Sequence, residues 1–264
     1  MAKQTRILLT THTFLPEHIG GAEYLVKYLS EELASRGEEP IIVGPPRGAE
    51  EIAKQENGFP KYIESPYSGI RNKLQTIRRI RRAYIDHDID IVHSHFAYPA
   101  GFLTELALLG KPSPHVITSH GADVFKMPNV GGYRFDRKKE HFIRWTLKRC
   151  DRHIMISDAM KEHAVEAGSS ESKMVKIRNP SPPIEEISSE DVEETLQKFD
   201  LENSSYVLTM CRHVPQKGLS YLINAFDSLA DDYPELQLVI GSDGEKRDDL
   251  EALVGSLGLK DRVT

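Results

Sequence analysis

The chain alternates short runs of apolar, often β-branched residues with longer segments whose apolar residues recur at helical spacing. Strands are expected at 7–14, 40–45, 89–96, 115–120, 152–157 and 173–178. Helices are expected at about 21–36, 71–85, 99–109, 137–149 and 158–167. Strands that alternate with helices imply a parallel sheet joined by right-handed crossovers. The fold class is therefore α/β, with a Rossmann-like arrangement.

The segment NPSPPIEEISSEDVEE (179–194) interrupts this alternation with prolines, serines and a run of acids. Such a composition is typical of a linker. We expect a first domain at 1–180, a linker at 181–204 and a second domain from 205 to 264. The second domain repeats the pattern, with strands at 206–210 and 236–241, helices at about 217–231 and 246–257, and a new strand at DRVT. Two strands and two helices are too few for a doubly wound domain, so this domain is expected to be only partly present.

The composition is that of an ordinary globular chain, 39% hydrophobic and 28% charged over 264 residues. The N-terminus has no signal-peptide pattern, and the longest apolar stretch, 102–109, is far shorter than the roughly 20 residues of a membrane helix. Cys150 and Cys211 are expected to be reduced core residues, which indicates a cytoplasmic protein. The net charge of −6 is uneven, because residues 1–180 are net basic. That half suits an anionic ligand or a membrane surface better than nucleic acid.

Parallel α/β sheets bind ligands at the carboxyl ends of their strands, so the residues just after each strand are candidates. Gly20 and Gly21 lie at the start of the first helix, where backbone N–H groups can approach a phosphate. A simple tight turn is the alternative. The chain has neither the G-x-G-x-x-G nor the P-loop motif, which argues against a dinucleotide enzyme or a P-loop NTPase.

Histidines lie near the carboxyl ends of two of the expected strands. His93 and His95 are two residues apart and point the same way, and His120 and Asp123 follow the next strand. Three interpretations stay open: a packed or hydrogen-bonded pair, a metal site completed by His120 or Asp123, and contact with a substrate. At His120, the following glycine favours contact with a sugar.

Cationic residues follow the first strand of the second domain. Arg212 and Lys217 lie beside a helix start, where two fixed cations can clamp a diphosphate and neutralise it as a leaving group. Gly241 and Gly244 follow the next strand and let the backbone pass close to the same group. These four residues are the candidates for donor binding in this domain.

Several ordered motifs now point to a known family. They are FLPEHIGGAEYLVKYLSEELASRG, SHGAD, ISDAMKEHAVEAG with VKIRNP, and CRHVPQKGLSYLINAF with LQLVIGSDGEKRDDLEALVGSLGL. Together they cover essentially the whole chain, and they resemble the family-4 retaining glycosyltransferases of GT-B fold. The resemblance implies an acceptor-side first domain, a nucleotide-sugar-binding second domain and catalysis in the cleft between them.

The resemblance also implies roles for individual residues. Gly20 and Gly21 would face the donor phosphates, His120 would contact the transferred sugar as the catalytic residue, and Arg212 with Lys217 would hold the diphosphate. His95 and Asp123 are candidate contacts to the acceptor or the sugar. The reaction implied is sugar transfer from a UDP-, GDP- or ADP-sugar with retention, without a metal or other cofactor. The acceptor, whether a glycan, a lipid-linked sugar or a small molecule, stays open.

The sequence departs from the family pattern at three places. Cys211 stands where the family usually has glycine, Asn179 is followed by Pro180 rather than glycine, and a later pair of glutamates would lie beyond Thr264. The alternatives are a truncated, non-catalytic nucleotide-binding paralogue and, with less support, a metal-dependent hydrolase built on His93, His95 and His120.

Two further features admit a second interpretation. Asp86, Asp88 and Asp90 match the D-x-D of metal-binding transferases, but they precede a strand, which favours ordinary turn chemistry. The helix at about 71–85 carries an apolar stripe formed by Ile70, Leu74, Ile77, Ile80 and Tyr84 among six basic residues. It is expected to cover the sheet, or alternatively to lie on the anionic inner face of a membrane.

Overall fold

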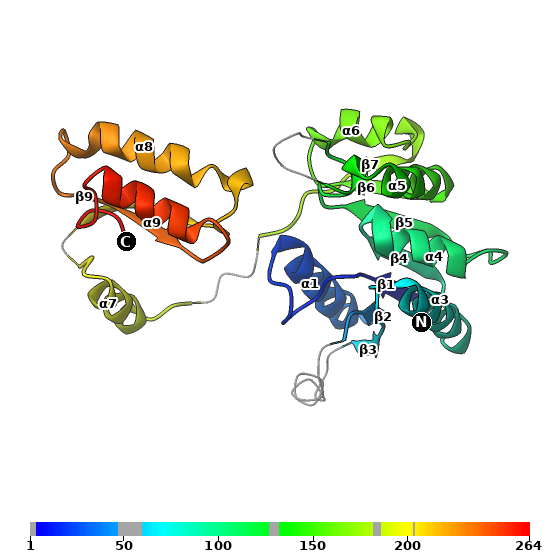
Figure 1. Ribbon diagram of the computed structural model, residues 1–264. Helices are drawn as coiled ribbons and strands as arrows, with labels where there is room; N and C mark the ends of the chain where they lie inside the picture. Colours follow the sequence, from blue (N-terminus) through cyan, green and yellow to red (C-terminus); the bar gives the residue numbers. More distant parts are fainter. Residues whose placement is uncertain (1–3, 47–59, 127–131, 182–185, 203) are drawn as a thin grey trace. The chain divides into compact units, whose positions relative to one another are not determined.

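A computed structural model describes residues 4–46, 60–126, 132–181, 186–202 and 204–264. The chain divides into two compact units, Met1–Pro182 and Pro183–Thr264 (Figure 1). Among the described residues, no helix combines the length and the apolar character that crossing a bilayer requires.

The first unit is built on one sheet of seven parallel strands in the order β3-β2-β1-β4-β5-β6-β7. The strands are β1 (Arg6–Thr10), β2 (Glu39–Gly44), β3 (Lys61–Glu64), β4 (Ile91–His95), β5 (His115–Ser119), β6 (Arg152–Met155) and β7 (Met174–Lys176). The α/β class and the parallel sheet are confirmed. The edge strand β3 was not predicted, because its four residues, KYIE, include no buried position and carry too short a pattern to identify.

Helices cover both faces of this sheet. They are α1 (Gly21–Ser35), α3 (Ile70–Asp86), α4 (Phe102–Ala107), α5 (Arg137–Arg149) and α6 (Met160–Glu166), with the short turns η1 (Ala97–Gly101), η2 (Tyr133–Phe135) and η3 (Glu171–Lys173). Leu9 on β1 packs with Val26 of α1, whereas its neighbour Leu8 packs with Ile80 of α3 and Leu103 of α4. Successive residues of a strand point to opposite faces, so the continuous apolar strands of the sequence reflect burial on both sides.

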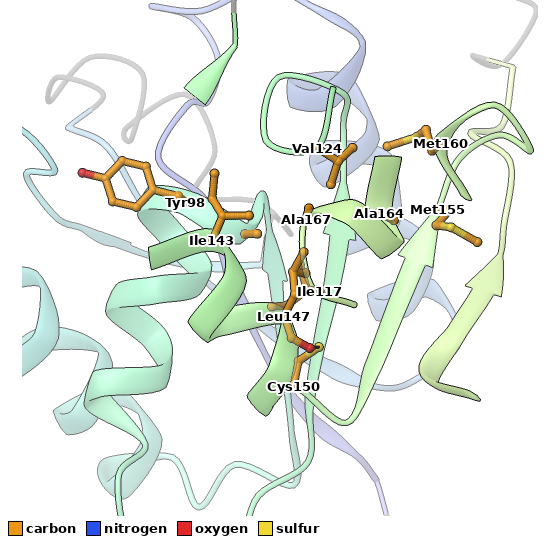
Figure 2. Packing of buried hydrophobic residues seen from close by; sticks show 11 residues of the cluster. Tyr98, Ile117, Val124, Ile143, Leu147, Cys150, Met155, Met160, Ala164 and Ala167 are labelled. Carbon is orange, nitrogen blue, oxygen red and sulfur yellow. Dashed lines mark hydrogen bonds between the residues drawn. The ribbon is translucent and has the colours of Figure 1, made fainter. Parts of the chain in front are cut away.

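The largest apolar cluster lies where α5 and α6 pack against β5 and β6 (Figure 2). Ile117, Ile143, Leu147 and Met160 are fully buried in it. Cys150 belongs to the same cluster, as expected for a reduced core cysteine. Cys211 is free but only half-buried, so its predicted place in a core is wrong. This packing fixes β5, the strand that leads into His120.

Helix α3 buries the later part of the predicted stripe, because Ile80 is fully buried and Ile77 and Tyr84 pack against the same core. Thr76, Ile80 and Ala83 face inward, whereas Ile70 and Leu74 at the beginning of the helix are exposed. The polar Thr76 takes an inward position because its hydroxyl hydrogen-bonds the backbone carbonyl of Pro66, 2.5 Å away, and the hydroxyl of Ser65. The helix covers the sheet as expected, with its apolar first turn left in solvent.

The second unit consists of α7 (Ser189–Lys198), β8 (Ser205–Met210), η4 (Pro215–Lys217), α8 (Leu219–Ala230), β9 (Leu236–Gly241) and α9 (Arg247–Ser256). Strands β8 and β9 pair in parallel, and Val263 adds a parallel bridge to Leu238, as expected for the start of another strand. Helix α7 lies within the segment interpreted as a linker, where no helix was predicted. The Ser188 hydroxyl caps it by accepting from the Asp191 N–H, and acids fill its first turn, which stabilises a helix despite the polar composition.

Candidate functional site

The turn after β5 carries His120 and is held by Asp123. This carboxylate is fully buried and accepts hydrogen bonds from the backbone N–H of Ala97 (2.8 Å), the hydroxyl of Ser119 (2.8 Å) and the N–H of His120 (3.2 Å). Burial raises its pKa. Asp123 therefore fastens the turn after β5 to the turn after β4, and all of its hydrogen-bond donors come from the chain itself. The geometry favours a positioning role over the predicted contact with a ligand.

A second buried hydrogen-bond chain continues from the same turn. The hydroxyl of Ser119 also lies 2.8 Å from Nε2 of His153 on β6. Nδ1 of His153 lies 2.9 Å from the hydroxyl of Ser169. Burial lowers the pKa of His153 to about 4, so the ring is neutral near pH 7. The end of β5 is thus tied to β6 and to the loop after α6.

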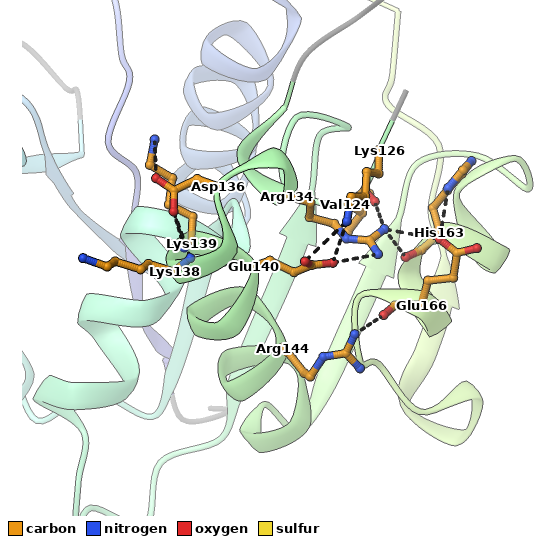
Figure 3. A network of polar contacts seen from close by, with 10 residues as sticks. All are labelled: Val124, Lys126, Arg134, Asp136, Lys138, Lys139, Glu140, Arg144, His163 and Glu166. Atoms are coloured by element: carbon orange, nitrogen blue, oxygen red, sulfur yellow. Dashed lines mark hydrogen bonds and ion pairs between the residues drawn. The ribbon is translucent and has the colours of Figure 1, made fainter. Parts of the chain in front are cut away.

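The loop after β5, which carries His120, is also held by Arg134, whose side chain is only 4% exposed (Figure 3). Its guanidinium donates to the carbonyl oxygens of Val124 (2.7 Å) and His163 (3.3 Å), and it pairs with Glu140 (3.3 Å) and Glu166 (3.5 Å). Because Val124 directly follows Asp123, Arg134 fixes the loop that carries His120 to α5 and α6. Sequence reasoning did not find Arg134, since nothing in its pattern distinguishes it from a surface arginine.

Two imidazoles, those of His93 and His95, stack in line with the ring of His120. The rings of His93 and His95 lie 4.5 Å apart, those of His95 and His120 lie 5.3 Å apart, and His95 Nδ1 is 3.0 Å from His120 Nε2. His93 Nε2 bonds the hydroxyl of Thr118 at 2.8 Å. Burial and the neighbouring imidazoles lower the pKa of His93 to about 3, and burial lowers that of His120 to about 4. These rings are neutral near pH 7 and act through hydrogen bonds rather than charge.

This cluster does not offer a metal site. Among the residues that the structure describes, no group of three or more His, Cys, Asp or Glu side chains is arranged to hold a metal ion. The nitrogens of His95 and His120 that face each other are already bonded together, and Asp123 is occupied by backbone and hydroxyl donors. The metal-dependent hydrolase alternative therefore has no ligand set in this part of the chain.

His12 is a further candidate for the site that was not predicted from the sequence. Its Nε2 lies 2.9 Å from the hydroxyl of Tyr133, and its ring lies 4.8 Å from that of Phe96, which in turn lies 4.6 Å from the ring of His120. The predicted strand ran to residue 14, which placed His12 inside it. Since β1 ends at Thr10, His12 follows a strand end, and the same rule that selected His120 selects it.

Gly20 and Gly21 lie at the start of α1, as predicted. A side chain at Gly20 would come within 2.7 Å of the Glu23 carboxylate, whereas one at Gly21 would meet nothing within 4 Å. A hollow of about 330 Å³ opens beside Gly21, lined also by Tyr24, Leu25, Tyr28, Asn179 and Pro180. The helix start is thus open to a ligand at Gly21.

The second unit brings its own candidates together at the ends of β8 and β9. The His213 N–H donates to the Asp243 carbonyl at 2.8 Å, and Gly244, at φ +157°, packs on the His213 backbone so closely that a Cβ would lie 2.6 Å from its carbonyl oxygen. Gly241 ends β9 and accepts from the Cys211 N–H at 3.3 Å. Arg212 and Lys217 flank these joined loops.

Both cations are exposed, and neither side chain forms a hydrogen bond or ion pair with any described residue. Lys217 ends the turn η4 directly before Gly218, the N-cap of α8. Two free cations beside a helix start can bind an anion without breaking an existing pair. The diphosphate clamp formed by Arg212 and Lys217 stays a prediction.

The three aspartates of the D-x-D match have structural partners. Asp86 pairs with Arg82, Asp88 pairs with Arg6 at 2.9 Å, and Asp90 accepts from the Arg6 N–H at 3.0 Å. They lie before β4, at the end of the sheet opposite His95. Their interpretation as turn chemistry is confirmed.

Comparison with known proteins places the chain in a family. The model of "Glycosyltransferase Family 4" matches residues 19–181, and that of "Glycosyl transferases group 1" matches residues 191–264. The chain belongs to glycosyltransferase family 4.

Curated relatives of this family-4 chain are distant. A phosphatidylinositol N-acetylglucosaminyltransferase protein of Arabidopsis thaliana is 22% identical over 272 residues, which cover 98% of this chain and 56% of the relative. Alpha-D-kanosaminyltransferase of Streptomyces kanamyceticus is 39% identical over 71 residues, or 27% of this chain and 18% of the relative. The relatives that the chain matches over nearly its whole length are covered to between 52% and 66% of their own length.

Solved structures show the same fold. Anabaena Alr3699/HepE in complex with UDP and glucose matches with a TM-score of 0.76 and 18% identity, over 99% of this chain and 68% of that one. Sucrose-phosphate synthase of Thermosynechococcus elongatus matches with a TM-score of 0.71 and 17% identity, over 99% and 70%. The predicted GT-B fold is confirmed.

Proposed function

We propose that this protein transfers a sugar from a nucleotide-diphosphate sugar to a hydroxyl acceptor with retention of anomeric configuration. The observation that carries the proposal is the pair of free, exposed cations Arg212 and Lys217 beside the joined loops after β8 and β9. Cations without internal partners at the carboxyl ends of parallel strands suit a diphosphate. Support also comes from Alr3699/HepE, whose crystal structures are of complexes with UDP and with UDP-glucose.

The proposed reaction needs no nucleophile on the protein. The acceptor oxygen forms a bond to the anomeric carbon on the face from which the diphosphate leaves, and the bond from that carbon to the phosphate oxygen breaks. The leaving phosphate takes the proton of the acceptor hydroxyl. Arg212 and Lys217 stabilise the charge that develops on the diphosphate, which is a large contribution in a preorganised site. No metal or further cofactor enters the scheme.

In the first unit, His120 is the proposed contact to the transferred sugar, because it is neutral, partly exposed and held by Asp123 and His95. Asp123 and His95 are fully buried and support His120 from behind. Gly20 and Gly21 present the N-terminus of α1, a preferred position for a phosphate.

Equilibrium binding of UDP, GDP and ADP to the 264-residue chain tests the proposal. We expect at least one nucleoside diphosphate to bind, and Lys217→Ala to weaken its binding. Lys198→Ala is the matched control, because this lysine is also exposed in the second unit but lies on α7. The proposal is wrong if none of the three binds, or if both substitutions have the same effect.

Release of nucleoside diphosphate from UDP-, GDP- and ADP-sugars separates the proposed enzyme from its alternative. Binding together with release supports transfer. Binding without release by any donor, with a range of sugar and lipid acceptors present, favours the non-catalytic nucleotide-binding paralogue.

A lipid-linked acceptor at the inner face of a membrane is the second part of the proposal. On α3, Ile70 is 80% and Leu74 is 53% exposed, next to the exposed Arg71 and Arg78. Apolar and basic side chains gathered on one helix suit an anionic bilayer surface. Two of the distant relatives are named for phosphatidylinositol-containing substrates. The protein would then be cytoplasmic and peripheral.

Not every basic residue of α3 is available for this contact. Lys73 donates to the Tyr98 hydroxyl, Arg79 to the Glu64 carbonyl and Arg81 to the Ala107 carbonyl. The test is therefore Arg71→Glu with Arg78→Glu, measured by co-sedimentation with vesicles containing phosphatidylserine. We expect binding by the unmodified chain and its loss in the double variant, with no binding to phosphatidylcholine alone. Equal binding before and after the substitutions contradicts the membrane contact.

A further inference from the structure

His95 and His120 share a hydrogen bond that bears on where the ring hydrogens of both side chains lie. Nδ1 of His95 and Nε2 of His120 lie 3.0 Å apart. The other nitrogen of His95, Nε2, is buried and has no partner among the described residues. From this geometry we infer that His95 sets the tautomer of His120, so that His120 presents an N–H on Nδ1 as a hydrogen-bond donor to its ligand.

The inference follows from the two ways in which the pair can share one hydrogen. If His120 donates from Nε2, then His95 must carry its own hydrogen on the buried Nε2, where it meets no acceptor among the residues described. If His95 donates from Nδ1, its buried Nε2 is an unprotonated acceptor. Among buried backbone groups, orphaned N–H donors are rarer than under-satisfied acceptors, and the same preference applied to the imidazole favours the second arrangement. His120 then accepts at Nε2 and keeps its hydrogen on Nδ1.

The protonated forms do not compete near neutral pH. Burial lowers the pKa of His95 well below its usual value and that of His120 to about 4. Each ring therefore carries one hydrogen, and the shared bond decides where both hydrogens lie. Since His120 is only partly buried and its Nδ1 is not among the enclosed atoms without a partner, Nδ1 is the nitrogen left for a ligand.

The same rule applies independently to a second histidine, the half-buried His12. His12 bonds the Tyr133 hydroxyl through Nε2, and its Nδ1 is buried without a partner among the described residues. The favoured tautomer of His12 is thus Nε2–H, which donates to the Tyr133 oxygen. Tyr133 must then direct its own hydrogen elsewhere, and its pKa, raised to about 12 by burial and nearby charges, keeps that hydrogen in place.

Both half-buried groups of this cluster are therefore set as donors, His120 through Nδ1–H and Tyr133 through O–H. They match a ligand that offers oxygen lone pairs, such as sugar hydroxyls. This identification of the ligand rests on the proposed function, whereas the tautomers do not. His95 and His12 are positioning residues that act through their partners.

Nitrogen NMR of the whole chain labelled with ¹⁵N-histidine measures the tautomers directly, because protonated and unprotonated ring nitrogens resonate far apart. At pH 7.5 we expect His95 and His120 in the Nδ1–H form and His12 in the Nε2–H form. The signals are assigned by their loss in His95→Asn, His120→Gln and His12→Gln. An Nε2–H form of His120, or a fast average of both forms, overturns the inference.

Two substitutions sharpen the assignment. His95→Asn keeps an amide N–H near the position of Nδ1, so His120 should keep its tautomer, whereas His95→Leu removes the donor and should convert the His120 signal to an average. His93→Gln is the control, because His93 stacks on His95 but bonds Thr118 instead of His120. It should leave the His120 signal unchanged. If His95→Leu does not fold, the spectrum of the unmodified chain still decides.

The outcome is independent of nucleotide binding. A chain that binds no nucleoside diphosphate but shows the expected tautomers refutes the proposed function and leaves the inference standing. A chain that binds nucleotide with His120 as Nε2–H refutes the inference alone.

Discussion

The candidate residues of the two units are supported in opposite ways. In the first unit His120 is held by a buried carboxylate, a buried imidazole and, through its loop, a buried guanidinium. In the second unit Arg212 and Lys217 stand free in solvent, and only the backbone around them is fixed. The first unit therefore has its hydrogen-bonding groups oriented before any ligand arrives, while the second keeps its charges unpaired for an anionic ligand.

The largest expected difference between the units is their response to acid. His12, His93, His95, His120 and His153 have lowered pKa values in the folded state, chiefly because of burial. Below pH 6.5 these histidines bind protons in the unfolded chain but not in the folded chain. The free energy of unfolding therefore falls as the pH drops toward about 4. Each such group costs about 1.4 kcal/mol one pH unit below 6.5, which sums to several kcal/mol at pH 5.5. Asp123 acts in the opposite direction, as one group against five.

Urea unfolding followed by tryptophan fluorescence checks this expectation. The single tryptophan of the chain, Trp145, lies on α5 in the first unit, so it reports that unit alone. Its unfolding midpoint should drop markedly between pH 7.5 and pH 5.5. The second unit contains one histidine, His213, and hydrogen exchange of its amides should change much less over the same range. Equal responses of the two units would contradict the comparison.

Removal of Arg134 is expected to have the next largest effect. Arg134→Met keeps much of the side-chain volume but leaves the carbonyl of Val124 without its side-chain donor and removes the buried partner of the Glu140 carboxylate. The free energy of unfolding should fall by roughly 3 kcal/mol, as for other buried charged hydrogen-bond networks. Lys126→Met is the control, because it breaks only an exposed ion pair with the same Glu140 and should cost less than about 0.5 kcal/mol. Both values come from urea titration of Trp145 fluorescence.

The same contrast explains what could be predicted from the sequence. Strand ends follow from periodicity, so His120, Arg212 and Lys217 could be selected as soon as the strands were placed. His12 was missed because the predicted end of β1 was wrong by a few residues, and strand boundaries are the least precise part of a prediction from periodicity. Arg134 could not be found, because its burial depends on contacts with α6, nearly 30 residues further along the chain.

Asp123 shows a different limit of sequence reasoning. Its position beside His120 was found, but a carboxylate that contacts a ligand and one that receives three internal hydrogen bonds look the same in a sequence. The burial of Thr76 on α3 was missed for a similar reason, since it depends on a hydrogen bond from its hydroxyl to a backbone carbonyl. Partners of polar groups are set by tertiary structure and not by spacing.

In the second unit, substitution of a free cation should affect ligand binding and not stability. Arg212→Ala removes no described contact, so the free energy of unfolding should change by less than about 0.5 kcal/mol. The dissociation constant of a bound nucleoside diphosphate should rise about tenfold, equivalent to about 1.4 kcal/mol. Isothermal titration calorimetry and thermal unfolding measure the two effects. A stability loss as large as that of Arg134→Met would mean that the second unit, too, uses its cations structurally.

The smallest effect on stability is expected at Gly21, a candidate of the first unit that is exposed, as Arg212 and Lys217 of the second unit are. Gly21 is the exposed first residue of α1, and an added Cβ there meets nothing within 4 Å. Gly21→Ala should therefore leave the free energy of unfolding unchanged within about 0.5 kcal/mol, or raise it slightly, because alanine favours the helix. A ligand phosphate that approaches the N–H groups of this helix start would meet the new methyl group, so nucleotide-sugar affinity should fall severalfold. Calorimetric titration with the donor that binds best measures this change, and Ala22→Gly, one residue further along the helix, serves as the matched control. If Gly21→Ala leaves the affinity unchanged, Gly21 is needed only for the turn. Among the described candidates of the first unit, only the donor groups of His120 and Tyr133 would then remain for contact with a ligand.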